Sequence, residues 1–152
     1  LSTENGDFKI HKVEVTPINE NPADKEVYMS SDIQIDIEVE KLQDGYENNV
    51  ILRLDSATGT VVLQDSMAFR ANPTIGLDKT GKHLISAKIP GNLLNYGMFY
   101  LTLFVAKDMQ DPELFEHLVK IPVKRPAYEA SSNWDIKNVM VRPHLEWLIS
   151  SK

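Results

Sequence analysis

The chain has 152 residues, of which 42% are hydrophobic and 25% charged, as expected for one globular domain with its own core. Its net charge of −6 and its scattered Lys and Arg residues disfavour a nucleic-acid or anionic-membrane partner, because phosphate binding needs clustered cations. The absence of cysteine excludes disulfides, cysteine nucleophiles and zinc–thiolate sites. No apolar run approaches the roughly 20 residues of a membrane-spanning helix. The start at Leu1, without Met, predicts a domain cut from a longer protein.

Apolar and polar residues alternate along most of the chain, which is the period of β-strands. The first strand is expected over residues 8–15, with a phase shift near His11 that predicts a β-bulge. The clearest strand covers residues 32–40, where every second residue is Ile or Val and the others are mostly acidic. Further strands are expected at 50–55, 61–63, 67–69, 82–89, 98–107, 113–123 and 139–149.

Eight or nine short strands with Gly and Pro between them predict an all-β fold, an antiparallel β-sandwich that forms one domain over residues 1–152. Only residues 92–96 suggest a helical turn. Residues 125–138 have no clear pattern and are interpreted as a linker to the final strand, 139–149.

Two motifs suggest chemistry that their context does not support. Residues 76–82 match most of a phosphate-binding loop, but His83 stands where Ser or Thr should hold magnesium, and a strand follows in place of a helix. We therefore expect a hairpin loop. The four histidines lack metal-ligand spacing, so neither a metal site nor a cofactor is expected.

Three carboxylates, Asp36, Glu38 and Glu40, lie on one face of the acidic strand. Paired carboxylates serve glycoside hydrolysis, and acidic rows can bind calcium. A regular alternating row is more typical of a solvated face that discourages edge pairing. A hydrolase is therefore the least favoured hypothesis, and no catalytic residue is predicted.

The outward face of the central strands carries unexpected aromatic residues. If the Leu residues of strands 50–55 and 98–107 point inward, then Tyr100 and Phe104 point outward, where exposed aromatics usually mark a contact surface. Sugars stack their C–H faces on aromatic rings, and their hydroxyls need polar partners. Two interpretations stay open, a sugar-binding face and a packing face. The candidate carbohydrate-binding residues are Arg53, Asp55, Gln64, Tyr100, Thr102 and Phe104.

Four segments together resemble the C-terminal domain of the ATP-binding subunit (Wzt type) of O-antigen polysaccharide ABC transporters. They are the opening strand 6–10 (GDFKI), the acidic strand, the connection 89–97 (IPGNLLNYG) with the strand after it, and the ending 139–147 (VMVRPHLEW). The resemblance covers nearly the whole chain. It implies an immunoglobulin-like β-sandwich.

The resemblance also implies a function and partners. The domain would recognise the exported O-antigen polysaccharide near its non-reducing end, without catalysis, at the cytoplasmic face of the bacterial inner membrane. Its partners would be an N-terminal ATPase domain outside this chain and the membrane subunit of the transporter. A homodimer that exchanges the last strand is implied as well, through Val139, Val141, Pro143, Leu145 and Trp147. The alternative is a protein-interaction or structural sandwich with no sugar ligand.

Overall fold

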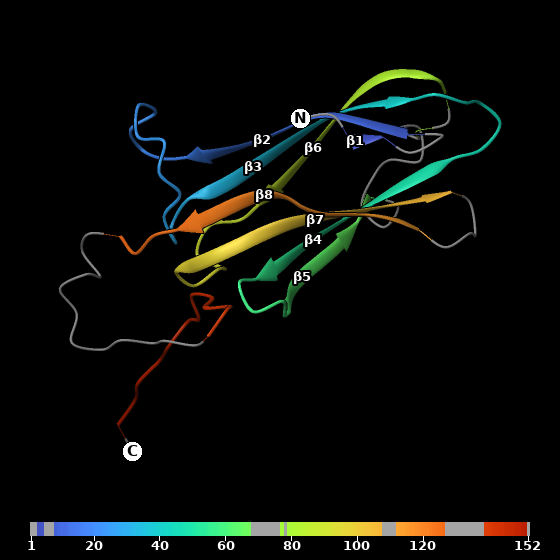
Figure 1. Ribbon diagram of the computed structural model, residues 1–152. Coiled ribbons are helices and arrows are strands. Elements are labelled where there is room, and N and C mark those ends of the chain that lie inside the picture. The colour runs from blue at the N-terminus through green and yellow to red at the C-terminus, as the bar shows by residue number, and fades with distance from the viewer. Residues whose placement is uncertain are drawn as a thin grey trace.

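Two four-stranded sheets pack face to face in the computed structural model, which describes residues 3–4, 8–67, 77, 79–107, 112–126 and 139–151 (Figure 1). The first sheet, in the order β1-β2-β3-β6, consists of β1 (Thr3–Glu4), β2 (Phe8–Ile18), β3 (Asp32–Lys41) and β6 (Gly81–Ile89). The second, in the order β5-β4-β7-β8, consists of β5 (Val61–Ser66), β4 (Asn48–Ser56), β7 (Gly97–Lys107) and β8 (Glu113–Val123).

All strand pairs within the two sheets are antiparallel, which confirms the predicted β-sandwich. The order β2-β3-β6 corresponds to strands A, B and E of an immunoglobulin-like domain, and β5-β4-β7-β8 corresponds to C′, C, F and G. The chain crosses between the sheets at the connections β3–β4, β5–β6 and β6–β7.

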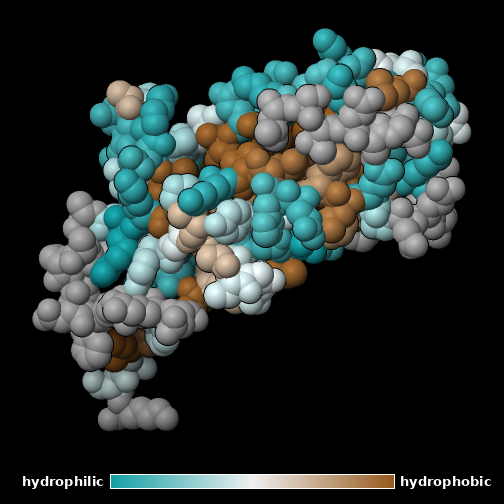
Figure 2. Space-filling model, in the orientation of Figure 1, coloured by the Kyte–Doolittle hydropathy of each residue, from teal (hydrophilic) through white to brown (hydrophobic). Residues whose placement is uncertain are grey.

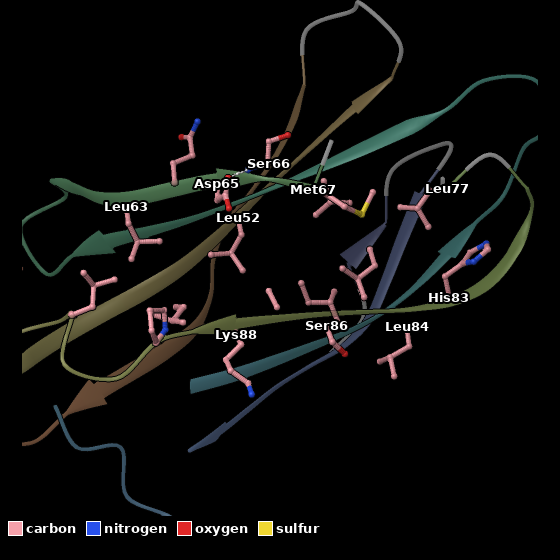
Figure 3. A pocket seen from close by; sticks show the side chains of 18 residues that line it. Leu52, Leu63, Asp65, Ser66, Met67, Leu77, His83, Leu84, Ser86 and Lys88 are labelled. Atoms are coloured by element: carbon pink, nitrogen blue, oxygen red, sulfur yellow. Dashed lines mark hydrogen bonds between the residues drawn. The ribbon is translucent and has the colours of Figure 1, made fainter. Parts of the chain in front are cut away.

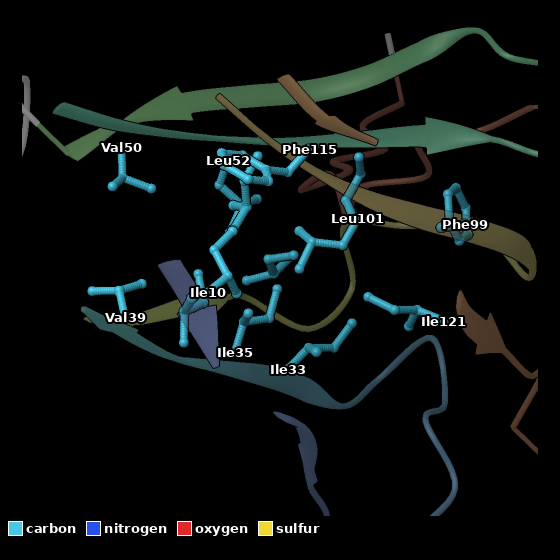
Figure 4. Packing of buried hydrophobic residues seen from close by; sticks show 14 of the residues in the cluster. Ile10, Ile33, Ile35, Val39, Val50, Leu52, Phe99, Leu101, Phe115 and Ile121 are labelled. Atoms are coloured by element: carbon cyan, nitrogen blue, oxygen red, sulfur yellow. The ribbon is translucent and has the colours of Figure 1, made fainter. Parts of the chain in front are cut away.

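The core lies between the sheets, as the alternation of residues predicts (Figure 4). The Ile and Val side chains of β3 point toward Leu52 and Leu54 of β4 and Leu101 and Leu103 of β7, and all of these are buried. Each fully buried side chain of this size stabilises the fold by about 1.5–3 kcal/mol. The acidic residues of β3 therefore lie on the opposite, outer face of the first sheet.

Both sheets contain a register shift. The shift in β2 lies between Ile10 and Lys12, which confirms the bulge expected near His11. The second sheet has a shift between Leu54 and Asp55 where β4 pairs with β5, and another in β8, where three residues, 116–118, lie opposite Thr102 of β7. Its central residue, His117, has a backbone φ of 49°.

Two sequence predictions are wrong. Residues 139–149 form no strand, because their only ladder contact is an isolated bridge between Val141 and Leu94. Residues 92–96 form no helical turn but an irregular connection, in which Asn92 has a φ of 60°. Two further predictions fall largely outside the described residues. They are the short strand at 67–69, of which only Met67 is described, and the linker 125–138, of which only Arg125 and Pro126 are described.

Candidate functional site

The residues predicted to bind sugar come together on the outer face of the second sheet. Arg53 of β4 lies between Gln64 of β5 and Thr102 of β7 in the strand register. One step along the sheet, Asp55 lies opposite Tyr100. Phe104 lies on the same face of β7, beyond Thr102. The six positions therefore form one surface across β5, β4 and β7.

Asp55 is the centre of this surface, and its side chain is only 2% exposed although it points away from the core. Arg53 holds it from the same strand, with Nε 2.7 Å from Oδ1 and Nη2 donating to Oδ2 at 3.1 Å. The hydroxyl of Thr102, itself fully buried, donates to the same Oδ2 at 3.0 Å. A buried carboxylate needs such charged and hydrogen-bonding partners.

His117, which the sequence reasoning missed, is the fourth member of this cluster. Its backbone N–H donates to Thr102 Oγ1 at 3.2 Å, and its Nε2 lies 3.7 Å from Asp55 Oδ2. Its ring lies 4.9 Å from the Tyr100 ring, tilted by 32°. The side chain remains 51% exposed. His117 is therefore the member of the cluster that a ligand can reach most easily.

The two predicted aromatic residues differ in their surroundings. The guanidinium carbon of Arg53 lies 4.9 Å from the centre of the Phe104 ring, a cation–π distance, so this cation already occupies that ring. Tyr100 contacts the His117 ring instead. Tyr100 with His117 thus forms the aromatic pair next to Asp55, while Phe104 supports Arg53.

The open edge of the sandwich is a second feature. A cavity of about 920 Å³, here called the edge groove, lies between the edge strands β5 and β6 (Figure 3). Leu52, Leu63, Leu77 and Ile85 form apolar walls, and Lys88 lies at the rim. Figure 2 shows that apolar side chains reach the surface in a band across the middle of the molecule.

The C-terminal segment divides into two parts. Residues 139–142 pair with residues 93–95 of the β6–β7 connection, a contact here called the tail anchor. In it, Asn95 Nδ2 donates to the carbonyl of Val139 at 2.7 Å, the Asn95 N–H donates to that of Met140 at 3.0 Å, and the Arg142 N–H donates to that of Leu93 at 2.7 Å. Beyond it, residues 143–151, here called the tail, extend away from the body (Figure 1).

The five residues predicted for strand exchange are thus separated by the structure. Val139 and Val141 belong to the tail anchor, and Pro143, Leu145 and Trp147 belong to the tail. The Trp147 side chain is 82% exposed, and Leu148 and Ile149 are almost fully exposed. Trp147 therefore takes no part in the core of its own chain.

The acidic row has a different environment. Asp36, Glu38 and Glu40 alternate along β3 and remain partly or fully exposed. His11 Nε2 lies 2.7 Å from Glu40 Oε1, and this hydrogen bond lowers the pKa of Glu40 below its usual value. Among the described residues, no group of three His, Cys, Asp or Glu side chains could hold a metal ion. In that part of the chain there is also no helix long and apolar enough to cross a membrane.

Comparison with known proteins finds similarity in structure. No family model and no curated protein sequence matches the chain. The crystal structure of the C-terminal domain of Wzt superposes with a TM-score of 0.71 at 11% identity, covering 99% of this chain and 88% of that chain. This chain has the fold of the Wzt C-terminal domain. The sequence resemblance and the observed fold therefore agree.

Two other solved structures superpose with lower TM-scores. A β-glucosidase from Listeria innocua has a TM-score of 0.39 at 10% identity, over 74% of this chain and 16% of the enzyme. The putative ApaA protein from Bordetella pertussis also has a TM-score of 0.39 at 10% identity, over 80% of this chain and 95% of that protein. Neither matches closely enough to inform the function.

Proposed function

We propose that this chain is the carbohydrate-binding module of a polysaccharide ABC transporter, and that it recognises the exported O-antigen polysaccharide near its non-reducing end. The observation that carries the proposal is the Wzt C-terminal fold over 99% of the chain. The module is non-catalytic in this proposal. It acts at the cytoplasmic face of the inner membrane, with an N-terminal ATPase domain and the membrane subunit as partners.

The outer face of the second sheet suits this role chemically. Tyr100 offers an aromatic ring on which the C–H face of a sugar can stack. Arg53 and Gln64 lie next to each other in the register and provide donors and an acceptor for hydroxyl groups. Asp55 and Thr102 are buried, so their part is to fix the orientation of Arg53 and of the β8 bulge. A few hydrogen bonds of about 0.5–1.5 kcal/mol each would give modest affinity.

The ligand can be tested directly by saturation-transfer NMR. The domain is titrated with the lipid-free cell-surface polysaccharide of its source organism, and an unrelated polysaccharide serves as the control. Selective transfer to the terminal residues of the source polysaccharide is expected. No transfer at millimolar repeat-unit concentration would contradict the proposal and leave the protein-interaction sandwich as the better hypothesis.

The site can be tested by Tyr100→Ala, with Phe104→Ala as its counterpart. Loss of one stacked aromatic ring costs about 0.5–1.5 kcal/mol, so Tyr100→Ala is expected to weaken glycan binding about three- to tenfold. Phe104→Ala should weaken binding less, because Phe104 lies beyond Thr102, away from Asp55 and His117. Isothermal titration measures both affinities. If Tyr100→Ala dissociates a dimer and leaves sugar binding intact, this face is a packing face.

A homodimer that exchanges the C-terminal segment is part of the proposal. The tail carries exposed Leu145, Trp147 and Ile149 in alternation, and the edge groove of the sandwich is apolar. An element with unsatisfied apolar residues and a matching open edge favours association with a second copy. Because the tail anchor pairs Val141 with Leu94 of the same chain, we propose that exchange involves the tail alone.

Deletion of residues 144–152 tests the dimer. The deletion is expected to convert a dimer to a monomer in sedimentation-velocity experiments, because it removes the exposed apolar tail. Ile18→Ala is a control, since Ile18 is an exposed apolar residue at the end of β2 and does not line the edge groove. A wild-type chain that is monomeric at high micromolar concentration would contradict the exchange.

A further inference from the structure

The β8 bulge places His117 where a bound sugar would lie, and this placement requires an unusual backbone. Its φ of 49° is in the left-handed region, which few residues other than glycine adopt. Bulges often re-aim one side chain next to a functional site. Here the bulge turns the imidazole onto the outer face, against Tyr100 and above Asp55. The Thr102 hydroxyl fixes it from below by accepting the His117 N–H.

The neighbours of the imidazole determine which nitrogen carries the proton. Nε2 faces the carboxylate of Asp55 at 3.7 Å, so the tautomer of the neutral ring that suits this neighbour carries its hydrogen on Nε2. Nδ1 then has a lone pair and can accept a hydrogen bond. Within the described residues, no hydrogen bond to Nδ1 is formed. An acceptor thus lies beside an aromatic ring on a half-exposed side chain.

Other charges near this imidazole come from three strands. Arg53 and Asp55 of β4 form an ion pair, so their charges largely compensate each other. Tyr100 of β7 contributes its phenol ring. Glu116 precedes His117 in the bulge, and Lys120 lies opposite Tyr100 in the register of β8. No single charge of fixed sign dominates the site, and a proton on Nδ1 changes its hydrogen-bonding pattern.

We propose that His117 contacts the glycan, with Nδ1 accepting a hydrogen bond from a sugar hydroxyl while the sugar lies against the outer side of the adjoining Tyr100 and His117 rings. This inference rests on the carbohydrate-binding function proposed above. It makes recognition dependent on pH. A proton on Nδ1 turns the acceptor into a donor. The neutral form of His117 is the binding form, and a ligand without a free hydroxyl at this position binds less tightly.

The test compares glycan affinity at about pH 8 and about pH 5.5, on either side of the range in which histidine usually titrates. Isothermal titration with the lipid-free source polysaccharide is expected to show binding about fivefold weaker at the lower pH, the loss of about one hydrogen bond. His117→Asn is the informative variant. Asn tolerates a positive φ and keeps an acceptor oxygen, but it does not titrate. His117→Asn should bind with little dependence on pH.

Two further variants control this experiment. His117→Ala removes the acceptor and should bind weakly at both pH values. His83→Asn changes a histidine of β6, in the other sheet, and should keep the pH profile of the wild type. The His117 Hε1 resonance should also shift on glycan addition, a response that a purely structural role would not give.

The outcomes separate this inference from the function on which it rests. If the wild type binds no polysaccharide at pH 8, the proposed function fails, and the inference fails with it. If the wild type binds but His117→Asn has the same pH profile, or His117→Ala binds as tightly as the wild type, the function stands and the inference is overturned.

Discussion

The two outer faces of the sandwich use similar residues in opposite ways. On the first sheet, Asp36, Glu38 and Glu40 stay in contact with water, and their neighbours across the strands include Lys12 and Lys82. On the second sheet, Asp55 is buried beneath Arg53 and next to Thr102. One face is therefore a solvated charge ladder, and the other contains a preorganised polar cluster.

The difference comes from what lies beside each carboxylate. Asp55 is covered by the long side chain of Arg53 from its own strand, by Thr102 of β7 and by His117 of the β8 bulge. The strands beside β3 leave its acidic residues half-covered or exposed. An ion pair in water contributes about 0–1 kcal/mol, whereas breaking a buried pair costs about 3–5 kcal/mol. The same alternating pattern can therefore be solvated in one place and structural in another.

Asp55→Ala is expected to give the largest effect. The substitution leaves Arg53, which is 20% exposed, without its ion-pair partner, and it leaves Thr102 without its hydrogen-bond acceptor. The free energy of unfolding should therefore fall by about 3–5 kcal/mol. Urea unfolding followed by circular dichroism measures the change. Glu38→Ala on the exposed ladder is the matched control and should change stability by no more than about 0.5 kcal/mol. Equal effects of the two substitutions would contradict the contrast between the faces.

Thr102→Val should have an intermediate effect. The hydroxyl donates to Asp55 and accepts from the His117 N–H, so its removal leaves both groups short of one bond. A loss of about 1–3 kcal/mol is expected in the same unfolding experiment. Thr16→Val is the control, because Thr16 lies on the outer face of the first sheet, opposite Gln34. If Thr102→Val leaves the free energy of unfolding unchanged, the cluster does not depend on the Thr102 hydroxyl.

His11→Ala should give the smallest effect, on the solvated face. The hydrogen bond from His11 lowers the pKa of Glu40, so the substitution should raise that pKa toward the ordinary value of 4.5. A lowered pKa in the folded state stabilises the protein above the unfolded pKa. This contribution is lost as the pH falls through the folded pKa, so the difference in stability should vanish in acid.

The Glu40 carboxyl carbon, followed by NMR against pH, reports this change. His144→Ala, in the tail, should leave the Glu40 titration midpoint where it is in the wild type. An unchanged midpoint in His11→Ala would show that the His11–Glu40 contact does not persist in solution.

Much of the fold could be predicted from the sequence, because burial imposes a period of two. The alternation of Ile and Val in 33–39 fixed which face of β3 is inside, and the phase shift near His11 revealed the bulge in β2. The final segment 139–149 shows the limit of this reasoning. It has the same alternation, yet beyond the tail anchor nothing in the described part of the chain covers it. The alternation of apolar and polar residues indicates which side chains need to be buried, but it does not indicate which segment buries them.

The candidate site could be predicted in part. Strand parity placed Arg53, Tyr100 and Phe104 on one face, as the structure shows. The β8 bulge could not be predicted, because Phe115 and Val119 remain an even number of positions apart and the alternation keeps its phase. For that reason His117 gave no sequence signal. The burial of Asp55 was also hidden, since it depends on side chains from three strands.

The tail anchor limits how far the C-terminal end can reach. The ten residues after Arg142, 143–152, span at most about 33–36 Å when fully extended. Within that radius, a short tether gives a group an effective concentration in the millimolar range. A docking site on the same chain would thus compete with the equivalent site on a second copy of the chain. In the proposed exchange, the reach of residues 143–152 from the tail anchor therefore matters as well as their composition.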